Sequence, residues 1–222
     1  MQGRLISFEG LDGVGKSTQV ELLREVLAAR NLTVQCFREP GGTQAGEELR
    51  TMIKLGRFET ALAELLAFET ARAELVGSRI RPALERGEIV ILDRFADSSL
   101  AYQGALGKIP AETIRQLNQI ATAGLQPDLT IWLALDPRQA LERRTGAEKP
   151  AAGGGQAEST DLDHIEKREL DYFRKVHDIF NMIMNEDGER FLRFDAALHI
   201  EAVHRSVSDS VLGRLKEWGW PT

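Results

Sequence analysis

The sequence is poor in the features that mark secreted, membrane-spanning and nucleic-acid-binding proteins. It has a single cysteine, Cys36, so an intrachain disulfide is impossible and a reducing cytoplasm is the expected compartment. No apolar run approaches the roughly 20 residues that a helix needs to cross a bilayer. The net charge is −6, which argues against broad affinity for nucleic acid but not against a local basic pocket. We therefore expect a cytoplasmic protein that binds neither membranes nor nucleic acid.

The apolar residues follow a regular alternation of two patterns. The chain has 222 residues, 42% of them hydrophobic and 28% charged, which suits a single domain over residues 1–222. Helical spacing of apolar residues separates short runs of strand length. This order predicts an α/β fold with a five-stranded parallel sheet, helices on both faces and ligands at the carboxyl ends of the strands. The expected strands lie at residues 5–8, 33–37, 89–92, 129–133 and 191–194.

A glycine-rich segment, residues 9–18, directly follows the first expected strand. It matches the pattern G-x-x-x-x-G-K-[ST] at Gly10, Gly15, Lys16 and Ser17. Glycines let the backbone wrap a polyphosphate, and the helix that begins near Lys16 adds its positive end. In such a loop the lysine reaches the β- and γ-phosphates and the serine hydroxyl joins the Mg²⁺ shell. The predicted nucleotide-binding residues are Gly10, Leu11, Asp12, Gly13, Val14, Gly15, Lys16, Ser17 and Thr18.

A phosphate loop alone does not choose between an ATPase, a GTPase switch and a small-molecule kinase. The Asn-Lys-x-Asp motif that reads guanine is missing, which disfavours a GTPase. Arg38 and Arg94 follow two other strands, where a planar guanidinium could bind two oxygens of a second phosphate. A surface ion pair would be the usual interpretation of one such arginine, but two beside a phosphate loop favour an anion site. Asp93 ends a buried strand, where Mg²⁺ or a hydrogen bond from Ser17 would compensate its charge.

Three further segments make the resemblance more specific. They read Arg-Glu-Pro-Gly-Gly-Thr at 38–43, Asp-Arg-Phe at 93–95 and Ala-Tyr-Gln-Gly at 101–104. With the phosphate loop they resemble bacterial thymidylate kinases, P-loop nucleoside monophosphate kinases, over nearly the whole chain. The resemblance implies the P-loop NTPase fold and transfer of the ATP γ-phosphoryl group to dTMP, giving dTDP and ADP for dTTP biosynthesis. It also implies Mg²⁺ and a homodimer. From the loop motif and the buried strand end, Ser17 and Asp93 are the predicted metal ligands, although Asp93 could instead be a paired aspartate with no metal role.

The resemblance implies roles for individual acceptor-side residues. Arg38 and Arg94 would clamp the acceptor phosphate. Phe68 would stack on thymine, and Arg72, on the same helix face, would hydrogen-bond its carbonyl. Tyr102 would press on the sugar where a 2′-hydroxyl would lie. The implied substrate-binding residues are Asp12, Arg38, Phe68, Arg72, Arg94, Ser98, Ser99, Tyr102 and Gln103.

Bland interpretations of these residues stay open beside the functional ones. Core packing would explain Phe68, and a turn would explain Asp12. Helix capping or packing would explain Ser98, Ser99, Tyr102 and Gln103. Glu9 resembles the acidic residue that opens the family's loop, and we assign it a supporting role only.

Phosphoryl transfer also needs positive charge and exclusion of water. The glycine-rich stretch 146–160 is the expected mobile lid. One branch of the family carries an arginine where this chain has Gly13, and the other supplies arginine from the lid, where this chain has none. We therefore expect Arg143 or Arg144 to be the catalytic cation, with Lys149 as a third candidate. Solvated helix charges are the alternative for each. The predicted catalytic residues are Lys16, Arg94, Arg143 and Arg144.

Two other functions compete with a dTMP kinase. The first is a P-loop kinase for another nucleotide or a nucleoside. The second is a non-catalytic, nucleotide-dependent switch, which would bind nucleotide and form no dTDP. The intact phosphate loop, Asp93 and the paired arginines argue against the second.

Overall fold

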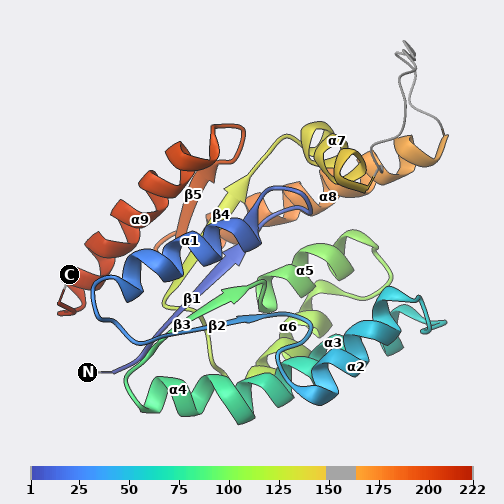
Figure 1. Ribbon diagram of the computed structural model, residues 1–222. Coiled ribbons are helices and arrows are strands. Elements are labelled where there is room, and N and C mark those ends of the chain that lie inside the picture. Colours follow the sequence, from blue (N-terminus) through green and yellow to red (C-terminus); the bar gives the residue numbers. More distant parts are fainter. Residues whose placement is uncertain (1, 149–163, 222) are drawn as a thin grey trace.

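The fold is built around one parallel β-sheet. The computed structural model describes residues 2–148 and 164–221. Their strands lie in the order β2-β3-β1-β4-β5, all parallel (Figure 1). All five expected strands are therefore confirmed, within one residue at their ends. Their bounds are β1 Arg4–Glu9, β2 Val34–Arg38, β3 Ile89–Asp93, β4 Leu129–Ala134 and β5 Phe191–Asp195.

Helices cover both faces of the sheet, as the sequence predicted. Helices α1 and α9 pack together on one face, and α3, α4, α5 and α6 lie on the other (Figure 1). Helix α8 packs against α5 on that second side. The helices are α1 Lys16–Ala28, α2 Gln44–Lys54, α3 Ala61–Leu75, the π-helical turn η1 Val76–Ile80, α4 Arg81–Glu85, α5 Ala96–Ala105, α6 Ala111–Thr122, α7 Pro137–Glu148, α8 His164–Glu186 and α9 Ile200–Glu217.

Side chains alternate along each strand and so divide the core between the two faces. Leu5, Val90 and Leu92 pack against the α3–α4 segment, whereas Ile6 and Phe8 pack on the α1 face. Strands buried on both faces need such nearly continuous apolar runs. The apolar stripe of α1 is buried on its side of the sheet: Val20, Leu23 and Leu27.

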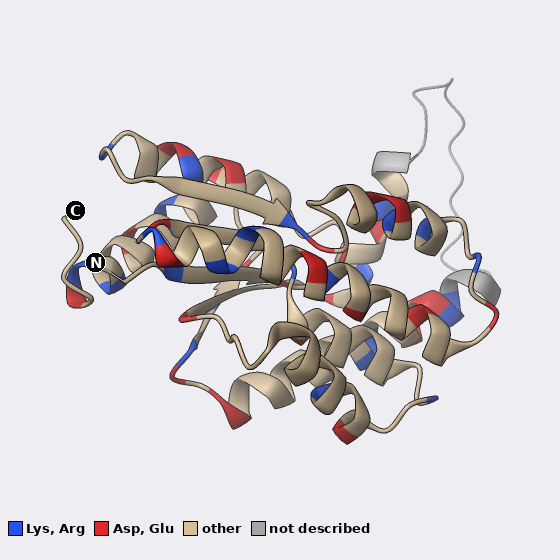
Figure 2. Ribbon diagram, turned by 90° about the horizontal axis from the view of Figure 1, so that it is seen from below, with Lys and Arg blue, Asp and Glu red and all other residues tan. Residues whose placement is uncertain are grey.

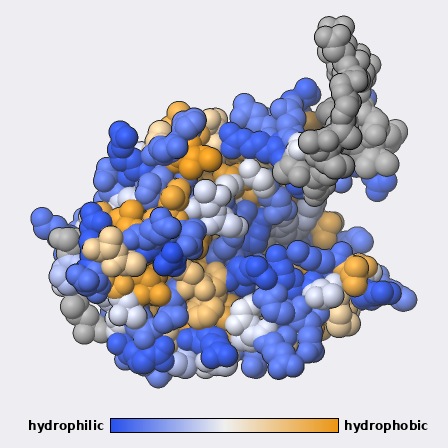
Figure 3. Space-filling view, viewed as in Figure 1, coloured by the Kyte–Doolittle hydropathy of each residue, from blue (hydrophilic) through white to orange (hydrophobic). Residues whose placement is uncertain are grey.

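The surface is mostly polar and carries both signs of charge. Hydrophilic residues dominate the face seen in Figure 3, with smaller apolar patches between them. Lysine and arginine alternate with aspartate and glutamate over the helices in Figure 2, so the negative net charge is dispersed. Among the described helices, none has both the length and the apolar character required to cross a bilayer.

The strand register places the candidate site. Phe8 of β1 and Arg38 of β2 both lie opposite Asp93 of β3. The carboxyl ends of these three neighbouring strands therefore meet at one edge of the sheet. The glycine-rich loop, the Arg38 segment and the turn after β3 all leave from this edge, as a parallel sheet requires of its ligand site.

Candidate active site

The glycine-rich loop joins β1 to α1, and Gly10, Gly13 and Gly15 in it have positive φ angles, which residues other than glycine rarely adopt. Gly10 has φ +139°, and a Cβ there would lie 2.5 Å from the Leu133 carbonyl oxygen. Lys16 turns back over the loop, and its Nζ donates to the carbonyl oxygens of Gly10 (3.2 Å) and Leu11 (2.8 Å). Burial, and secondarily the nearby cation of Arg94, lower the pKa of Lys16 to about 8. The ammonium group is thus held by neutral carbonyls in a place where phosphate oxygens would stabilise its charge.

Ser17 and Asp93, the predicted metal pair, lie in direct contact. The Ser17 hydroxyl donates to Asp93 Oδ2 across the end of β3. Magnesium in phosphate sites takes one or two protein ligands and completes its shell with phosphate oxygens and water. A hydroxyl and a carboxylate fit that donor set. The described residues hold no group of three or more His, Cys, Asp and Glu side chains arranged to bind a metal by themselves.

One cavity of about 650 Å³ contains both halves of the predicted site. The phosphate loop forms one wall, and residues of α2, α3 and α5 form the others. Leu11 and Val14 of the loop are instead buried in the core. All the substrate-binding residues predicted from the sequence line the cavity: Asp12, Arg38, Phe68, Arg72, Arg94, Ser98, Ser99, Tyr102 and Gln103.

Arg94 stands in the middle of this cavity. It has φ +75°, an uncommon value for a residue other than glycine. Its guanidinium donates to Asp12 Oδ1 (2.5 Å), Ser98 Oγ (2.9 Å) and Tyr102 Oη (2.9 Å). Burial alone would raise the pKa of Asp12, but the positive charges of Arg94 and Lys16 have the larger effect, and the pKa is lowered. Asp12 therefore links the phosphate loop to the acceptor-side arginine.

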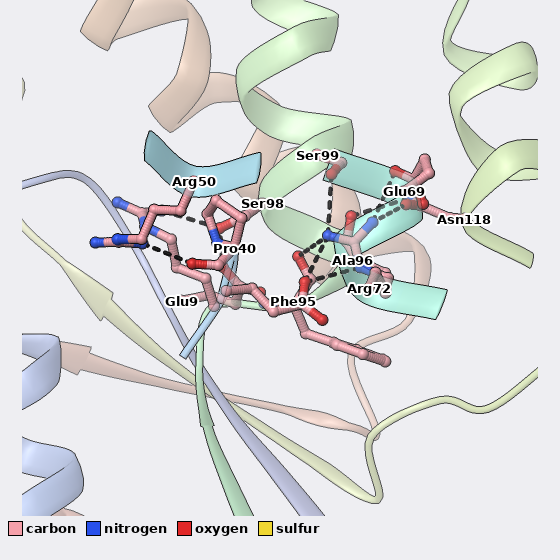
Figure 4. A network of polar contacts seen from close by, with 12 residues as sticks. Glu9, Pro40, Arg50, Glu69, Arg72, Phe95, Ala96, Ser98, Ser99 and Asn118 are labelled. Carbon is pink, nitrogen blue, oxygen red and sulfur yellow. Dashed lines mark hydrogen bonds and ion pairs between the residues drawn. The ribbon is translucent and has the colours of Figure 1, made fainter. Parts of the chain in front are cut away.

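Arg72 lies at the opposite wall, where it is 2% exposed. Each of its five N–H groups has a partner, and these partners come from the segment after β2, from α3, α5 and α6, and from the turn before α5 (Figure 4). A thymine carbonyl could reach the guanidinium only by sharing or replacing one of them. The accepting atoms are Glu39 Oε2 (2.8 Å), Glu69 Oε1 (2.7 Å), Asn118 Oδ1 (2.6 Å), the Phe95 carbonyl (3.2 Å) and Ser99 Oγ (3.0 Å).

Two buried carboxylates share the single cation of Arg72. Glu39 is 5% exposed and Glu69 is 5% exposed, and the second oxygen of each has no hydrogen-bond partner among the described residues. Burial therefore raises the pKa of Glu39 to about 7, although Arg72 opposes the shift. Arg72 thus has two carboxylates to balance its one positive charge, whereas Glu39 must share that single cation with Glu69.

The structure adds Arg50 to the cavity that Arg38 and Arg94 line, a position that sequence reasoning missed. Arg50 of α2 lines the cavity, and its Nη1 donates to the Pro40 carbonyl (2.8 Å). Burial, followed by the nearby cations Arg38 and Arg94, lowers its pKa. Arg38 itself is largely exposed and pairs with Glu47 (3.0 Å). The only sequence signal for Arg50 was a basic residue in the helix after the Arg-Glu-Pro-Gly-Gly-Thr segment.

Phe68 and Tyr102 occupy positions that suit a nucleoside. Phe68 is half-buried at the cavity wall and belongs to neither core cluster, so simple core packing does not account for it. Tyr102 donates weakly to the Gly10 carbonyl (3.4 Å) while its oxygen accepts from Arg94. Its ring lies 4.6 Å from the Arg94 guanidinium carbon.

The predicted catalytic cations Arg143 and Arg144 lie on α7, beside the phosphate loop but not among the residues that line the cavity. Arg143 Nη1 donates to the Ala196 carbonyl (2.9 Å), and Arg144 pairs with Glu169 (2.5 Å). A Cβ at Gly13 would lie 3.0 Å from the Ala140 carbonyl and 3.1 Å from the Arg144 amide nitrogen. Helix α7 thus fills the space beside Gly13, which explains glycine at this position.

The predicted lid falls mostly outside the described residues. Helix α7 continues to Glu148, so the first positions of the stretch 146–160 are helical. Lys149 and the rest of that stretch lie outside the described residues.

Comparison with known proteins agrees with this geometry. The family model described as thymidylate kinase matches residues 8–207. The chain belongs to the thymidylate kinase family. A thymidylate kinase from Chlorobaculum tepidum is 42% identical over 209 residues, which cover 93% of this chain and 96% of the relative. One from Thermoanaerobacter sp. (strain X514) is 37% identical over 212 residues, covering 95% and 98%.

A solved structure extends the likeness to three dimensions. The crystal structure of thymidylate kinase from Ehrlichia chaffeensis superposes with a TM-score of 0.74 at 30% identity, over 96% of this chain and 99% of that chain. The P-loop NTPase fold and membership of the thymidylate kinases, the P-loop kinases that phosphorylate dTMP, are therefore confirmed.

Proposed function

We propose that this protein transfers the γ-phosphoryl group of ATP to dTMP, giving dTDP and ADP, with Mg²⁺ as cofactor. The observation that carries the proposal is the shared cavity: the phosphate loop and a cluster of three arginines open onto the same space. The γ-phosphate of ATP and the phosphate of dTMP could then lie next to each other, so direct transfer would need no covalent enzyme intermediate.

The acceptor phosphate needs no dedicated base. A phosphate monoester is ionised near neutral pH, so its oxygen can attack the γ-phosphorus directly. Catalysis then consists of positioning and charge neutralisation. Lys16 would leave the carbonyls of Gly10 and Leu11 for the β- and γ-phosphates, and Arg94 would hold the attacking phosphate. Arg38 and Arg50 would complete the acceptor clamp from β2 and α2.

Ser17 and Asp93 are the residues that would hold Mg²⁺. The ion, when bound, neutralises charge on the donor phosphates. Asp93 ends a buried strand and would keep its place in the site because the Ser17 hydroxyl and the strand register both fix it.

The nucleoside would lie between Phe68 and Tyr102. Ser99 accepts an N–H from Arg72, so its own hydroxyl proton is available to a carbonyl of the base. The Ser99 hydroxyl, polarised by the N–H that it accepts from Arg72, would favour a base with a carbonyl at that edge. Gln103 would add an amide to the same wall.

The identity of the phosphoryl acceptor is tested by one assay with four candidate acceptors. Wild-type protein is incubated with ATP, Mg²⁺ and dTMP, dUMP, dCMP or thymidine, and both ADP release and the phosphorylated product are measured. We expect dTMP to give the highest kcat/KM. Equal or better turnover of thymidine would favour a nucleoside kinase, and nucleotide binding without dTDP would favour a switch. A parallel reaction with EDTA should lose its activity if Mg²⁺ is required.

We also propose that the protein is a cytoplasmic homodimer. Helix α3 exposes Leu62 (49%) and Leu66 (43%), and the neighbouring α2 exposes Met52 (43%) with Leu55 (62%) just beyond its end. Exposed apolar side chains on two helices that pack together suit an interface between copies. Sedimentation equilibrium measures the state, and a monomer at micromolar concentration would contradict the proposal.

A further inference from the structure

Glu9 is a buried carboxyl group beside the site that the phosphoryl-transfer chemistry does not itself require. It is the last residue of β1 and is 0% exposed. Both of its oxygens are engaged by the turn that leads into α5. Oε1 accepts from the Phe95 amide (2.8 Å), and Oε2 is bonded to the Ser98 hydroxyl (2.5 Å). Phe95 is the N-cap residue of α5, and its own side chain makes no capping hydrogen bond. Glu9, at the end of β1, instead accepts the Phe95 amide hydrogen and places a carboxyl group at the start of this helix.

The same contacts lead directly to Arg94. Ser98 Oγ, which is bonded to Glu9, also accepts an N–H from Arg94 Nη1 (2.9 Å). The backbone is fixed in parallel, because the Arg94 amide donates to the Phe8 carbonyl (3.0 Å) next to Glu9. Arg94 has φ +75°, and a long side chain keeps such a conformation only where its surroundings impose it. The end of β1 therefore restrains both the backbone and the guanidinium of Arg94.

We propose that Glu9 is a positioning residue for phosphoryl transfer, which acts through Ser98 to hold the Arg94 guanidinium at the acceptor phosphate. This inference rests on the proposed dTMP kinase activity. It assigns to Glu9 no contact with substrate, metal or the reacting atoms.

The link does not depend on the charge of Glu9. Burial and the neighbouring Asp97 raise the pKa of Glu9 to about 8, so both protonation forms are populated near neutral pH. The ionised form accepts the Ser98 proton. The protonated form donates to Ser98 Oγ, which has a second lone pair for the Arg94 N–H. Either form keeps Ser98 between Glu9 and Arg94.

This chemistry selects the informative variants. Glu9→Gln has the shape of the protonated acid: its oxygen can accept from Phe95, and its amide can donate to Ser98. Glu9→Leu has a similar volume and can make neither bond. Ser98→Ala removes the link to Arg94 and leaves the Glu9–Phe95 bond in place, so it serves if Glu9→Leu fails to fold. Ser208→Ala is the matched control, since Ser208 is also a buried helical serine but lies on α9.

The test compares KM and kcat for dTMP and ATP, with dTMP binding measured separately by titration calorimetry. Glu9→Leu and Ser98→Ala should each weaken dTMP binding about tenfold and change the KM for ATP less than about twofold. Glu9→Gln should stay within about threefold of wild type, and Ser208→Ala should match it. In an Arg94→Ala background, Glu9→Leu should add less than about twofold, because its target has been removed.

Four results would overturn the inference. The first three are unchanged dTMP binding in a folded Glu9→Leu or Ser98→Ala protein, equal effects on ATP and dTMP, and full additivity with Arg94→Ala. If Glu9→Gln lost as much as Glu9→Leu, charge and not the hydrogen-bonded link would be the cause, and the inference would also fail. Wild-type protein that forms no dTDP would instead refute the proposed function, so the two failures are distinguishable.

Discussion

The donor and acceptor sides of the cavity hold their cations in different ways. On the proposed donor side, the hydrogen bonds of Lys16 within the described part of the chain go to the carbonyls of Gly10 and Leu11, in one short segment. On the acceptor side, Arg72 joins groups that lie 23 to 46 positions away, at Glu39, Phe95, Ser99 and Asn118, besides Glu69 one helical turn before it. A phosphate site can be made from local backbone, whereas this wall of the nucleoside site needs side chains from several elements.

The two cations also differ in how well their charges are compensated. Lys16 has a pKa lowered to about 8 by burial, so an incoming polyphosphate would stabilise it. Arg72 has two buried carboxylates of its own and needs no ligand to remain charged. We therefore expect substitution of Lys16 to affect activity, and substitution of Arg72 to affect stability as well as dTMP binding.

The largest expected effect on activity comes from Lys16→Ala. Removing this cation should lower kcat by on the order of 10³-fold, because charge developing on the transferred group would lose its closest protein partner. The unfolding free energy should fall little, since the lysine bonds only to carbonyls of its own loop. Coupled ADP release and urea unfolding measure the two quantities. Lys216→Ala, on the exposed face of α9, is the control, and near-normal turnover of Lys16→Ala would contradict the phosphate-loop assignment.

Arg72→Ala should affect both stability and binding. Leaving Glu39 and Glu69 buried without their cation should lower the unfolding free energy by about 3–5 kcal/mol. The KM for dTMP should rise by about tenfold or more while that for ATP changes little, because the network borders only the acceptor side. Arg79→Ala, an exposed arginine in η1, controls for loss of a charge. Equal changes in both KM values would show that Arg72 does not serve the acceptor pocket.

The smallest effect concerns the pH dependence of stability. The pKa of Glu39 is raised from an ordinary 4.5 to about 7, so the folded state binds its proton more tightly than the unfolded state. The unfolding free energy should therefore fall as pH rises from about 4.5 to about 7, by about 1–3 kcal/mol for this group. Urea unfolding across this range should show a shallower decline for Glu39→Gln than for wild type. Glu48→Gln, on the exposed face of α2, should keep the wild-type slope, and an unchanged slope in Glu39→Gln would refute this account.

Expectations from the sequence succeeded where the signal was local. Apolar runs located the five strands because a buried parallel strand must be apolar on both faces. The spacing of Gly10, Gly15, Lys16 and Ser17 identified the phosphate loop because each residue type has a separate task there: the glycines allow the tight backbone turn, the lysine binds phosphate, and the serine binds Mg²⁺. The resemblance then supplied the candidate acceptor residues; all of them line the cavity, and their roles stay predictions.

Other features depended on contacts between distant segments. No local pattern distinguishes Arg50 at the cavity from a solvated helix charge. Nor does the sequence show that Arg143 and Arg144 are engaged by Ala196 and Glu169, because those partners follow far along the chain. Whether Arg143 or Arg144 supplies the catalytic cation stays a prediction.

The sequence by itself determined that a phosphate loop follows the first strand of a parallel α/β fold, since neighbouring residues suffice to form it. Only the tertiary structure decided the order of the strands. It also decided that Arg38, Arg50 and Arg94 line one cavity and that every N–H group of Arg72 has a hydrogen-bond partner. The physical reason is that burying a charge requires partners at fixed distances, and folding brings those partners together from segments that carry no local mark of one another.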